Sequence, residues 1–269
     1  YIAEKDAFLM GTITTRSLYK YDSGQRSTLL CPDQSDSVYG VMGIDYNEGI
    51  IWVCTAALPE INNYSDSIKN QSSVFGISQK TGEILFQHIV PNAILGDIVY
   101  YKDGMALASD GLNNTIYSIT ASDVTIFADL SANVMNLQGI SIHKNLIYCS
   151  DYLTGLYIYD TGSKELIKIK SNDLYSEKGT DGVIFQNNRL YCFQNGTSPK
   201  RVFSITIENN QAAEINLIDQ NLYDKGEPTQ GVIVGNQIYY IGNSAWDGYV
   251  DGKYQPSPDL KIRSIKTLQ

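Results

Sequence analysis

GTDGVIFQNNRLYCFQNGTSPKRVFSITI, residues 179–207, is the stretch that decides the fold. A small or polar doublet leads into a short apolar strand, and a tight polar turn leads to a second strand rich in aromatic and β-branched residues. A polar corner and a third strand follow. Alternation within short apolar runs bounded by turn residues predicts one antiparallel, up-and-down sheet.

The same plan recurs along the whole chain. Matching stretches begin at Val41, Leu95, Leu137, Thr180 and Thr229. Successive starts lie roughly 40 to 55 residues apart, which is the repeat length of four-stranded propeller blades. With an earlier unit in residues 1–30, the pattern predicts an all-β, six-bladed β-propeller of four-stranded antiparallel blades. We expect one domain over residues 1–269.

The first and last units are incomplete. YIAEKD at residues 1–6 reads as the tail of an inner strand, and its beginning is expected before Tyr1. The segments DAFLMGTI, SLYKYD and RSTLL then form the second, third and outermost strands. The last unit, residues 228–269, has three evident strands. We expect its outer strand to come from the N-terminal side, because closing the ring would hide the sheet edges.

Composition narrows the class of partner. The 29 acidic side chains outnumber the 20 Lys and Arg, the net charge is −9, and no basic run occurs. Nucleic-acid binding therefore has no electrostatic support. No apolar stretch reaches the roughly 20 residues that span a bilayer. We therefore expect a soluble mature chain. Because it begins with Tyr1 and shows no charged-then-apolar leader, we expect a processed product that could be exported, while the compartment and the oligomeric state stay open.

The four cysteines do not predict disulfides. Cys54, Cys149 and Cys192 fall at matching places in the second strands of three different blades. Equivalent positions in different blades should be farther apart than the Cα separation of about 4.4–6.8 Å that a disulfide needs. We expect free, buried thiols that take no part in redox or zinc chemistry.

Antiparallel geometry predicts where a site would form. The residues that open the first strand of a blade and those that close its second strand lie at the same edge. The opening positions are Met42, Gly96 with Asp97, Gln138, Asp181 and Gln230, and the closing positions are Thr55, Asp110, Asp151, Asn195 and Asn243. Aspartates and amides dominate this set, so we expect a polar central mouth.

Two long connections should reach the same mouth. Residues 56–73 and 244–259 join second to third strands, and long loops in compact domains are often binding loops. They carry Tyr64, Trp246, Tyr249 and Tyr254. Aromatic rings beside amides suit a small polyhydroxyl or heterocyclic ligand, or a cation. The alternative is that these rings only pack the loops against the sheets.

Three stretches carry a family resemblance: LGDIVYYKDGMALASDGLNNTIYSI from Leu95, TDGVIFQNNRLYCFQNGTSPKRVFSI from Thr180, and EPTQGVIVGNQIYYIGNSAWD from Glu227. They resemble the bacterial branch of the family named for senescence marker protein, gluconolactonase and luciferin-regenerating enzyme. The resemblance implies a six-bladed propeller and a lactonase or esterase that uses a divalent ion on its central axis.

The resemblance also implies particular ligands. Asp181 matches the family's metal-binding aspartate, and Gln138 stands where an asparagine is expected. Gly96 replaces another asparagine, while Asp97 keeps the second member of that pair; a family glutamate would lie before Tyr1. Asp181 and Gln138 are thus the expected metal ligands, with Ca²⁺ the favoured ion. Asp97, Asp151 and Asp181 are the candidate catalytic carboxylates, and no organic cofactor is expected.

Alternatives remain open for these residues. Asp110 and Asp151 could simply cap turns by accepting backbone N–H groups. His88 and His143 lie away from the predicted mouth, which argues against a histidine-dependent hydrolase.

The predicted substrate-binding residues are Gln138, Asn195, Gln230, Asn243, Trp246 and Tyr64. The second reading is a propeller that binds a small molecule or a protein without turnover and keeps a degraded metal site.

Overall fold

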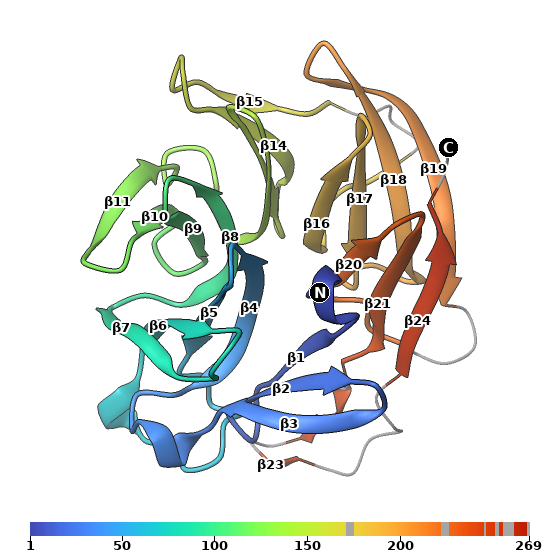
Figure 1. The fold of residues 1–269 in the computed structure, drawn as a ribbon. Helices are drawn as coiled ribbons and strands as arrows, with labels where there is room; N and C mark the ends of the chain where they lie inside the picture. Colours follow the sequence, from blue (N-terminus) through green and yellow to red (C-terminus); the bar gives the residue numbers. More distant parts are fainter. Residues whose placement is uncertain (171–174, 222–225, 245, 251–252, 255–260, 268–269) are drawn as a thin grey trace. The chain divides into compact units, whose positions relative to one another are not determined.

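The computed structural model describes residues 1–170, 175–221, 226–244, 246–250, 253–254 and 261–267 (Figure 1). The chain forms two compact units, Tyr1–Ala132 and Asn133–Gln269. Almost all regular structure is antiparallel strand, with four short 3₁₀ turns among the described residues. None of the described helices is long and apolar enough to cross a membrane.

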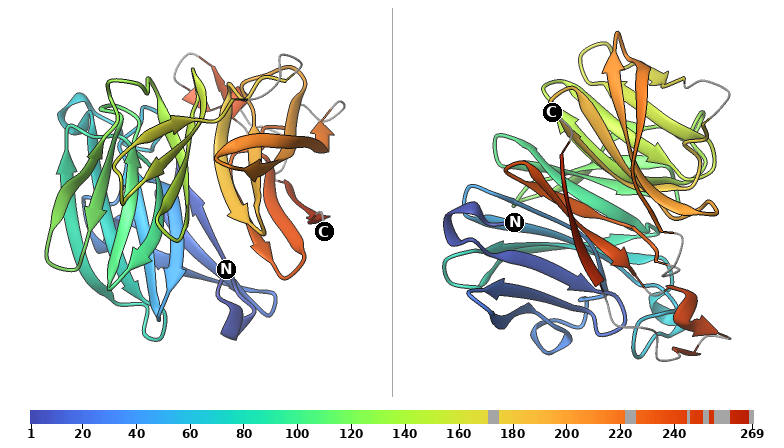
Figure 2. Two further views of the ribbon diagram at one scale, coloured as in Figure 1. Left: turned by 90° about the horizontal axis from the view of Figure 1, so that it is seen from above. Right: turned by 90° about the vertical axis from the view of Figure 1, so that its right-hand side faces the viewer.

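The first unit contains three sheets whose strands pair in chain order. They are β1 (Phe8–Thr12), β2 (Ser17–Asp22) and β3 (Gln25–Leu30); β4 (Gly40–Asn47), β5 (Ile50–Ala56), β6 (Gln71–Ser78) and β7 (Ile84–Pro91); and β8 (Leu95–Lys102), β9 (Met105–Asp110), β10 (Thr115–Ile119) and β11 (Val124–Asp129). The 3₁₀ turns η1 (Ala3–Lys5), η2 (Pro32–Gln34) and η3 (Asp66–Ile68) lie between them. The first strands of adjacent sheets, β1, β4 and β8, lie side by side (Figure 2).

The second unit repeats this plan. Its sheets are β12 (Leu137–His143), β13 (Leu146–Asp151), β14 (Gly155–Asp160) and β15 (Leu166–Lys168); β16 (Thr180–Gln186), β17 (Arg189–Gln194), β18 (Lys200–Glu208) and β19 (Gln211–Asn221); and β20 (Gly231–Val234), β21 (Gln237–Asn243) and β24 (Lys261–Lys266). The turn η4 (Trp246–Gly248) and the hairpin of β22 (Tyr249–Val250) and β23 (Lys253–Tyr254) lie in the β21–β24 connection. Six up-and-down sheets make the chain a six-bladed β-propeller, as predicted.

The two incomplete blades differ from expectation. YIAEKD is not the tail of an inner strand: residues 3–5 form η1, and Asp6 at φ 49° turns the chain back so that Ile2 bridges to Ala7. That left-handed residue breaks the extended run that the alternation suggested. In the last sheet, no strand of the described residues pairs with the far side of β24, so the expected outer strand is not seen there.

Apolar side chains from neighbouring sheets form the core. Phe75 and Ile51 of one sheet cluster with Leu18 and Leu30 of the sheet before it, all fully buried. Comparable clusters join the second sheet to the third, the fourth to the fifth, and the fifth to the sixth. Each fully buried Leu, Ile or Phe contributes about 1.5–3 kcal/mol relative to an exposed one. A blade therefore depends on its neighbour for stability.

A β-bulge interrupts the first strand near its start in four blades. The pairing register shifts between Val41 and Gly43, Leu95 and Asp97, Leu137 and Ile140, and Thr180 and Val183. Bulges bend a strand and redirect a side chain, and they are common beside functional sites. Here the bulges fall on the predicted opening positions, including Gln138 and Asp181.

Glycine follows the bulge where neighbouring first strands approach most closely. A Cβ on Gly139 would lie 2.6 Å from the carbonyl oxygen of Asp181 and 2.8 Å from the Cα of Gly182. A Cβ on Gly43 would lie 2.6 Å from the backbone nitrogen of Ile98. These backbones cannot separate without opening the core between the blades, so only glycine fits.

The cysteines are free, as expected. Cys54, Cys149 and Cys192 are fully buried, and burial raises the pKa of the Cys149 thiol to about 12. One detail of the sequence alignment was wrong. Cys149 and Cys192 pair with Ile140 and Val183 on the neighbouring strand. Cys54 pairs with Gly43 instead, and Val53 pairs with Ile44, so Cys54 lies one position farther along its strand than the other two cysteines do on theirs.

We expect Gly139→Ala to lower the free energy of unfolding by about 1–3 kcal/mol, because the added methyl group overlaps the backbone of β16. Urea denaturation measures this loss. Gly162→Ala is the matched control, since Gly162 is exposed and the nearest atom to its Cβ would be a side-chain oxygen of Asp160 at 3.2 Å. Equal stability of the two variants would contradict the close approach.

We expect a thiol reagent to label no cysteine of the native protein other than the half-buried Cys31. The thiolate is the reactive form, and burial disfavours it at the other three positions. Mass spectrometry after brief labelling, with and without denaturant, gives the number of labelled cysteines. Rapid labelling of Cys149 in the native protein would contradict its burial.

Candidate functional site

The strand ends that were expected to meet do so in the fourth and fifth blades. Leu137 at the start of β12 pairs with Asp151 at the end of β13, and Thr180 at the start of β16 pairs with Gln194 at the end of β17. We call the strand-starting side of the second unit, with Gln138, Asp181, Asn195 and Gln230, the opening edge.

Three opening residues are neighbours along this edge. The Oγ of Ser150, which accepts the N–H of Gly139, donates to the carbonyl oxygen of Asp181 at 2.5 Å. The N–H of Gly182 donates to the carbonyl oxygen of Thr229 at 2.9 Å. Because Gly139 follows Gln138 and Thr229 precedes Gln230, Asp181 stands between the two glutamines.

A hydrogen-bonded chain orients the Asp181 carboxylate. The Nδ2 of Asn195 donates to the Oδ2 of Asp181 at 2.9 Å, and the Tyr152 hydroxyl donates to the Oδ1 of Asn195 at 3.0 Å. Burial raises the pKa of Tyr152, and the negative charges of Asp181 and Glu227 raise it further. Tyr152 therefore remains a hydrogen-bond donor at neutral pH, which fixes which way the Asn195 amide faces.

Glu227 is the functional-site candidate that sequence reasoning missed. It is 7% exposed, and its Oε1 lies 2.7 Å from the Nζ of Lys200. Its Oε2 accepts the backbone N–H of Trp246 at 2.7 Å and the hydroxyl of Ser244 at 3.3 Å. This buried carboxylate ties the β21–β24 connection to the start of the last sheet, and the Glu-Pro pair opening the EPTQG motif was the available signal.

The anchored connection carries one predicted aromatic side chain to the site. Trp246 follows Ser244 on the segment held by Glu227, and its ring centroid lies 6.2 Å from that of Tyr249. The Tyr254 side chain lies outside the described residues. Asn243, at the end of β21, is 6% exposed and pairs with Lys261 on β24. Trp246 and Asn243 thus flank the last blade's end of the opening edge.

Asp151 has the contacts of a turn cap. It is fully buried, and its carboxylate accepts the backbone N–H groups of Met135, Leu153 and Thr154. Asp110 in the first unit repeats this, accepting the N–H of Ile94 and of Leu112, both at 2.9 Å. Both aspartates therefore cap turns, which is one of the two roles that the sequence left open for them. Catalysis by Asp151 stays a prediction.

Two predicted site residues belong to the first unit. Asp97 is 8% exposed, and its Oδ1 accepts the N–H of Ile98 at 2.9 Å. It occupies the position that glycine holds after the bulge in the blades of Gly43 and Gly139. Tyr64 is partly buried and packs against Tyr39, Ala57 and Ile61. This contact agrees with the alternative that the ring only packs its loop against the sheets. The opening edge defined above is confined to the second unit.

The donor set at the opening edge is one of oxygen atoms. Asp181 supplies a carboxylate, and the Gln138 amide is oriented by donating its Nε2 hydrogen to Asn136. Among the described residues, no group of three or more His, Cys, Asp or Glu is placed to hold a metal ion. A carboxylate with amide and water oxygens fits a hard ion such as Ca²⁺, with much of its shell supplied by water.

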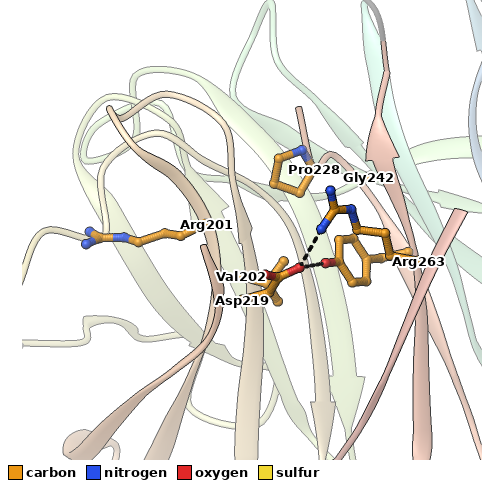
Figure 3. A pocket seen from close by; sticks show the side chains of 7 residues that line it. Arg201, Val202, Asp219, Pro228, Gly242 and Arg263 are labelled. Atoms are coloured by element: carbon orange, nitrogen blue, oxygen red, sulfur yellow. Dashed lines mark hydrogen bonds and ion pairs between the residues drawn. The ribbon is translucent and has the colours of Figure 1, made fainter. Parts of the chain in front are cut away.

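A small pocket in the same unit is occupied largely by side chains that bond to one another (Figure 3). It is lined by Arg201, Val202, Asp219, Pro228, Tyr240, Gly242 and Arg263. The Asp219 carboxylate accepts the Tyr240 hydroxyl and lies 3.4 Å from Arg263. Burial and the Asp219 charge raise the pKa of Tyr240. These groups join β19, β21 and β24 and leave little room for a ligand.

Comparisons with known proteins identify the fold of this chain but do not assign it to a family. No protein-family profile matches the chain, and no curated protein matches it. A catalytically inactive virginiamycin B lyase from Staphylococcus aureus with quinupristin is 18% identical, with TM-score 0.61 over 90% of this chain and 80% of that one. A PQQ-bound aldose sugar dehydrogenase from Streptomyces coelicolor is 16% identical, with TM-score 0.59 over 96% and 91%.

A chain in a nidogen–laminin complex is equally similar in shape, with TM-score 0.63, 14% identity, and 90% and 86% coverage. The similar structures thus include a lyase, a dehydrogenase and a chain from a protein complex. At these identities the likeness shows the propeller fold alone, because one fold hosts many unrelated functions.

We expect Lys200→Met to lower the free energy of unfolding by about 1–3 kcal/mol, because it leaves the Glu227 carboxylate largely buried without its cation. Adding Glu227→Gln should restore part of the loss, since a neutral amide costs less to bury. Urea denaturation compares both variants with Lys164→Met, a control in an exposed turn. The ion pair is unimportant if the single variant matches that control.

Proposed function

We propose that the opening edge binds a small polar molecule and acts as a lactone or ester hydrolase that uses a divalent metal ion, with Ca²⁺ the best fit. The observation that carries the proposal is the orientation of Asp181 by Asn195 and Tyr152, at a bulged strand start between Gln138 and Gln230. A carboxylate held in a fixed direction among amides is suited to binding a cation or a polar ligand.

Each residue has a distinct role in this proposal. Asp181 is the carboxylate that would hold the ion with Gln138, or would take a proton from an attacking water. Asn195 fixes the direction of that carboxylate. Gln230 and Trp246 offer an amide and a ring to the substrate. When bound, the ion would polarise the substrate carbonyl and lower the pKa of a coordinated water.

The second candidate is binding without turnover. The amide groups beside Asp181 are compatible with it, since Gln138, Asn195 and Gln230 offer hydrogen-bonding groups that need no metal ion. The amides and Trp246 would serve a small ligand equally well without hydrolysis, since the oriented carboxylate can also accept hydrogen bonds from a bound hydroxyl group.

Asp181→Asn separates these functions. It keeps the size of the side chain but removes the charge, so hydrolysis of a reactive lactone in Ca²⁺ should fall by a factor of about 10² or more in kcat/KM. Asp103→Asn, at an exposed turn with φ 51°, is the matched control and should retain full activity.

The outcomes are distinct. Full activity of Asp181→Asn would contradict the hydrolase proposal. Absence of turnover in the wild type across a lactone and ester panel, with Ca²⁺ binding seen by calorimetry and lost in Asp181→Asn, would support the binding function instead.

A further inference from the structure

A second pocket opens at the other end of the strands that form the opening edge. It is lined by His143, Lys144, Asn145, Leu146, Tyr148, Phe185, Asn188, Ile207, Asn209 and Asn210. These residues come from the β12–β13, β16–β17 and β18–β19 hairpins, all in the second unit. We call it the hairpin pocket. With about 3.3 Å per residue along β12, it lies roughly 20 Å from Gln138.

Three rings form a ladder along one side of the hairpin pocket. Tyr148 and Phe185 are stacked, with ring centroids 4.1 Å apart and planes at 7°. His143 lies over the same phenyl ring, 5.1 Å away at 41°. His143 is exposed while Tyr148 is buried, so the ladder runs from the protein interior to solvent and gives the pocket a rigid aromatic wall.

The Tyr148 hydroxyl can bond to a ligand in the hairpin pocket. The residue as a whole is only 2% exposed, but its hydroxyl is not among the buried polar atoms, and it makes no hydrogen bond to the described residues. Burial raises its pKa to about 12, so it is a neutral donor at physiological pH. Because the residue lines an open pocket, this hydroxyl can donate to water or to a bound ligand.

Apart from Leu146 and Ile207, the rest of the lining is amide and cationic. Asn188, Asn209 and Asn210 have positive φ values of 64°, 50° and 60°, as does Lys144 at 56°, so tight hairpin turns fix their backbones. Within the described chain, the side chains of these four residues make no hydrogen bond or ion pair. No carboxylate lines the pocket, although the chain carries a net charge of −9.

We propose that the hairpin pocket binds an acidic sugar residue, a uronate. The C–H face of a pyranose can lie against the His143 ring at the exposed end of the ladder, as apolar surface does on aromatic rings. The sugar hydroxyls match the amides of Asn188, Asn209 and Asn210 and the Tyr148 hydroxyl. Its carboxylate matches Lys144, the one fully charged group in the lining. No acidic side chain lines the pocket, and the nearby Asp160 carboxylate is engaged by the Nδ2 of Asn145 at 3.0 Å.

Calorimetric titration with trigalacturonate and with its fully methyl-esterified form tests the proposal. We expect the wild type to bind the acid more tightly than the uncharged ester. Lys144→Gln should weaken binding of the acid about three- to fivefold, as for a solvent-exposed ion pair, and leave the ester unaffected. Tyr148→Phe should weaken both ligands about fivefold by removing one hydrogen bond.

Two controls locate the ligand. Lys164→Gln is matched to Lys144→Gln, since Lys164 is also exposed at a turn with φ 61°, and it should bind as the wild type does. Asp181→Asn, at the opening edge, should also leave trigalacturonate affinity unchanged.

Any of three results would overturn the proposal: no heat of binding with either sugar up to the millimolar range, equal affinity for acid and ester, or loss of binding in Asp181→Asn with none in Tyr148→Phe. Thermal denaturation of Tyr148→Phe separates a binding effect from unfolding, because the change removes only a hydroxyl that makes no hydrogen bond to the described residues.

Discussion

The structure depends on how closely the first strands of adjacent blades approach. At Gly43 and Gly139 the neighbouring backbone stands where a Cβ would be. Behind this contact, apolar side chains of two sheets fill each interface. Because protein interiors pack at crystal-like density, the backbones cannot move apart at one point without leaving a void at another. The spacing of strands at the opening edge is therefore set by the core.

That spacing explains why polar residues can gather at the strand starts. The bulge turns one residue per blade away from the ladder, and the following glycine lets the next blade come close. Gln138 and Asp181 occupy that position in consecutive blades, and Gln230 stands just before β20, whose pairing with β21 has no bulge. Hydrogen bonds between blades hold the arrangement: the N–H of Phe185 donates to the Ser141 hydroxyl at 2.9 Å. The first unit has a similar hydrogen bond between blades, in which the backbone N–H of Tyr100 donates to the Asp45 carboxylate at 2.6 Å.

Much of the fold was predictable from the sequence because short alternating strands and turn residues are local signals. The failures have local or long-range causes. YIAEKD looked extended, but Asp6 adopts a left-handed conformation that no hydrophobic pattern reveals. The shift of Cys54 relative to Cys149 comes from pairing register, which a one-residue bulge changes without changing composition. The Glu227–Lys200 ion pair joins two blades, so neither residue carries a signal by itself.

The second unit thus offers two different chemistries at opposite ends of its strands. The opening edge presents an oriented carboxylate among amides, and the hairpin pocket presents rings, amides and a cation without any carboxylate in its lining. This separation follows from the antiparallel blade, which brings the strand starts to one side and the first hairpin turns to the other. The propeller scaffold explains where each set lies, and the side chains determine what it can bind.

The central claim is that Gln138, Asp181 and Gln230 share one cation-accessible edge. Paramagnetic broadening by Mn²⁺, followed on the side-chain amide NMR signals of the glutamines and asparagines, tests it directly. The account predicts that low Mn²⁺ concentrations broaden the signals of Gln138, Asn195 and Gln230 while those of Asn209 and Asn210 stay sharp. Equal broadening of both groups, or broadening that spares Gln138 and Gln230, would contradict it.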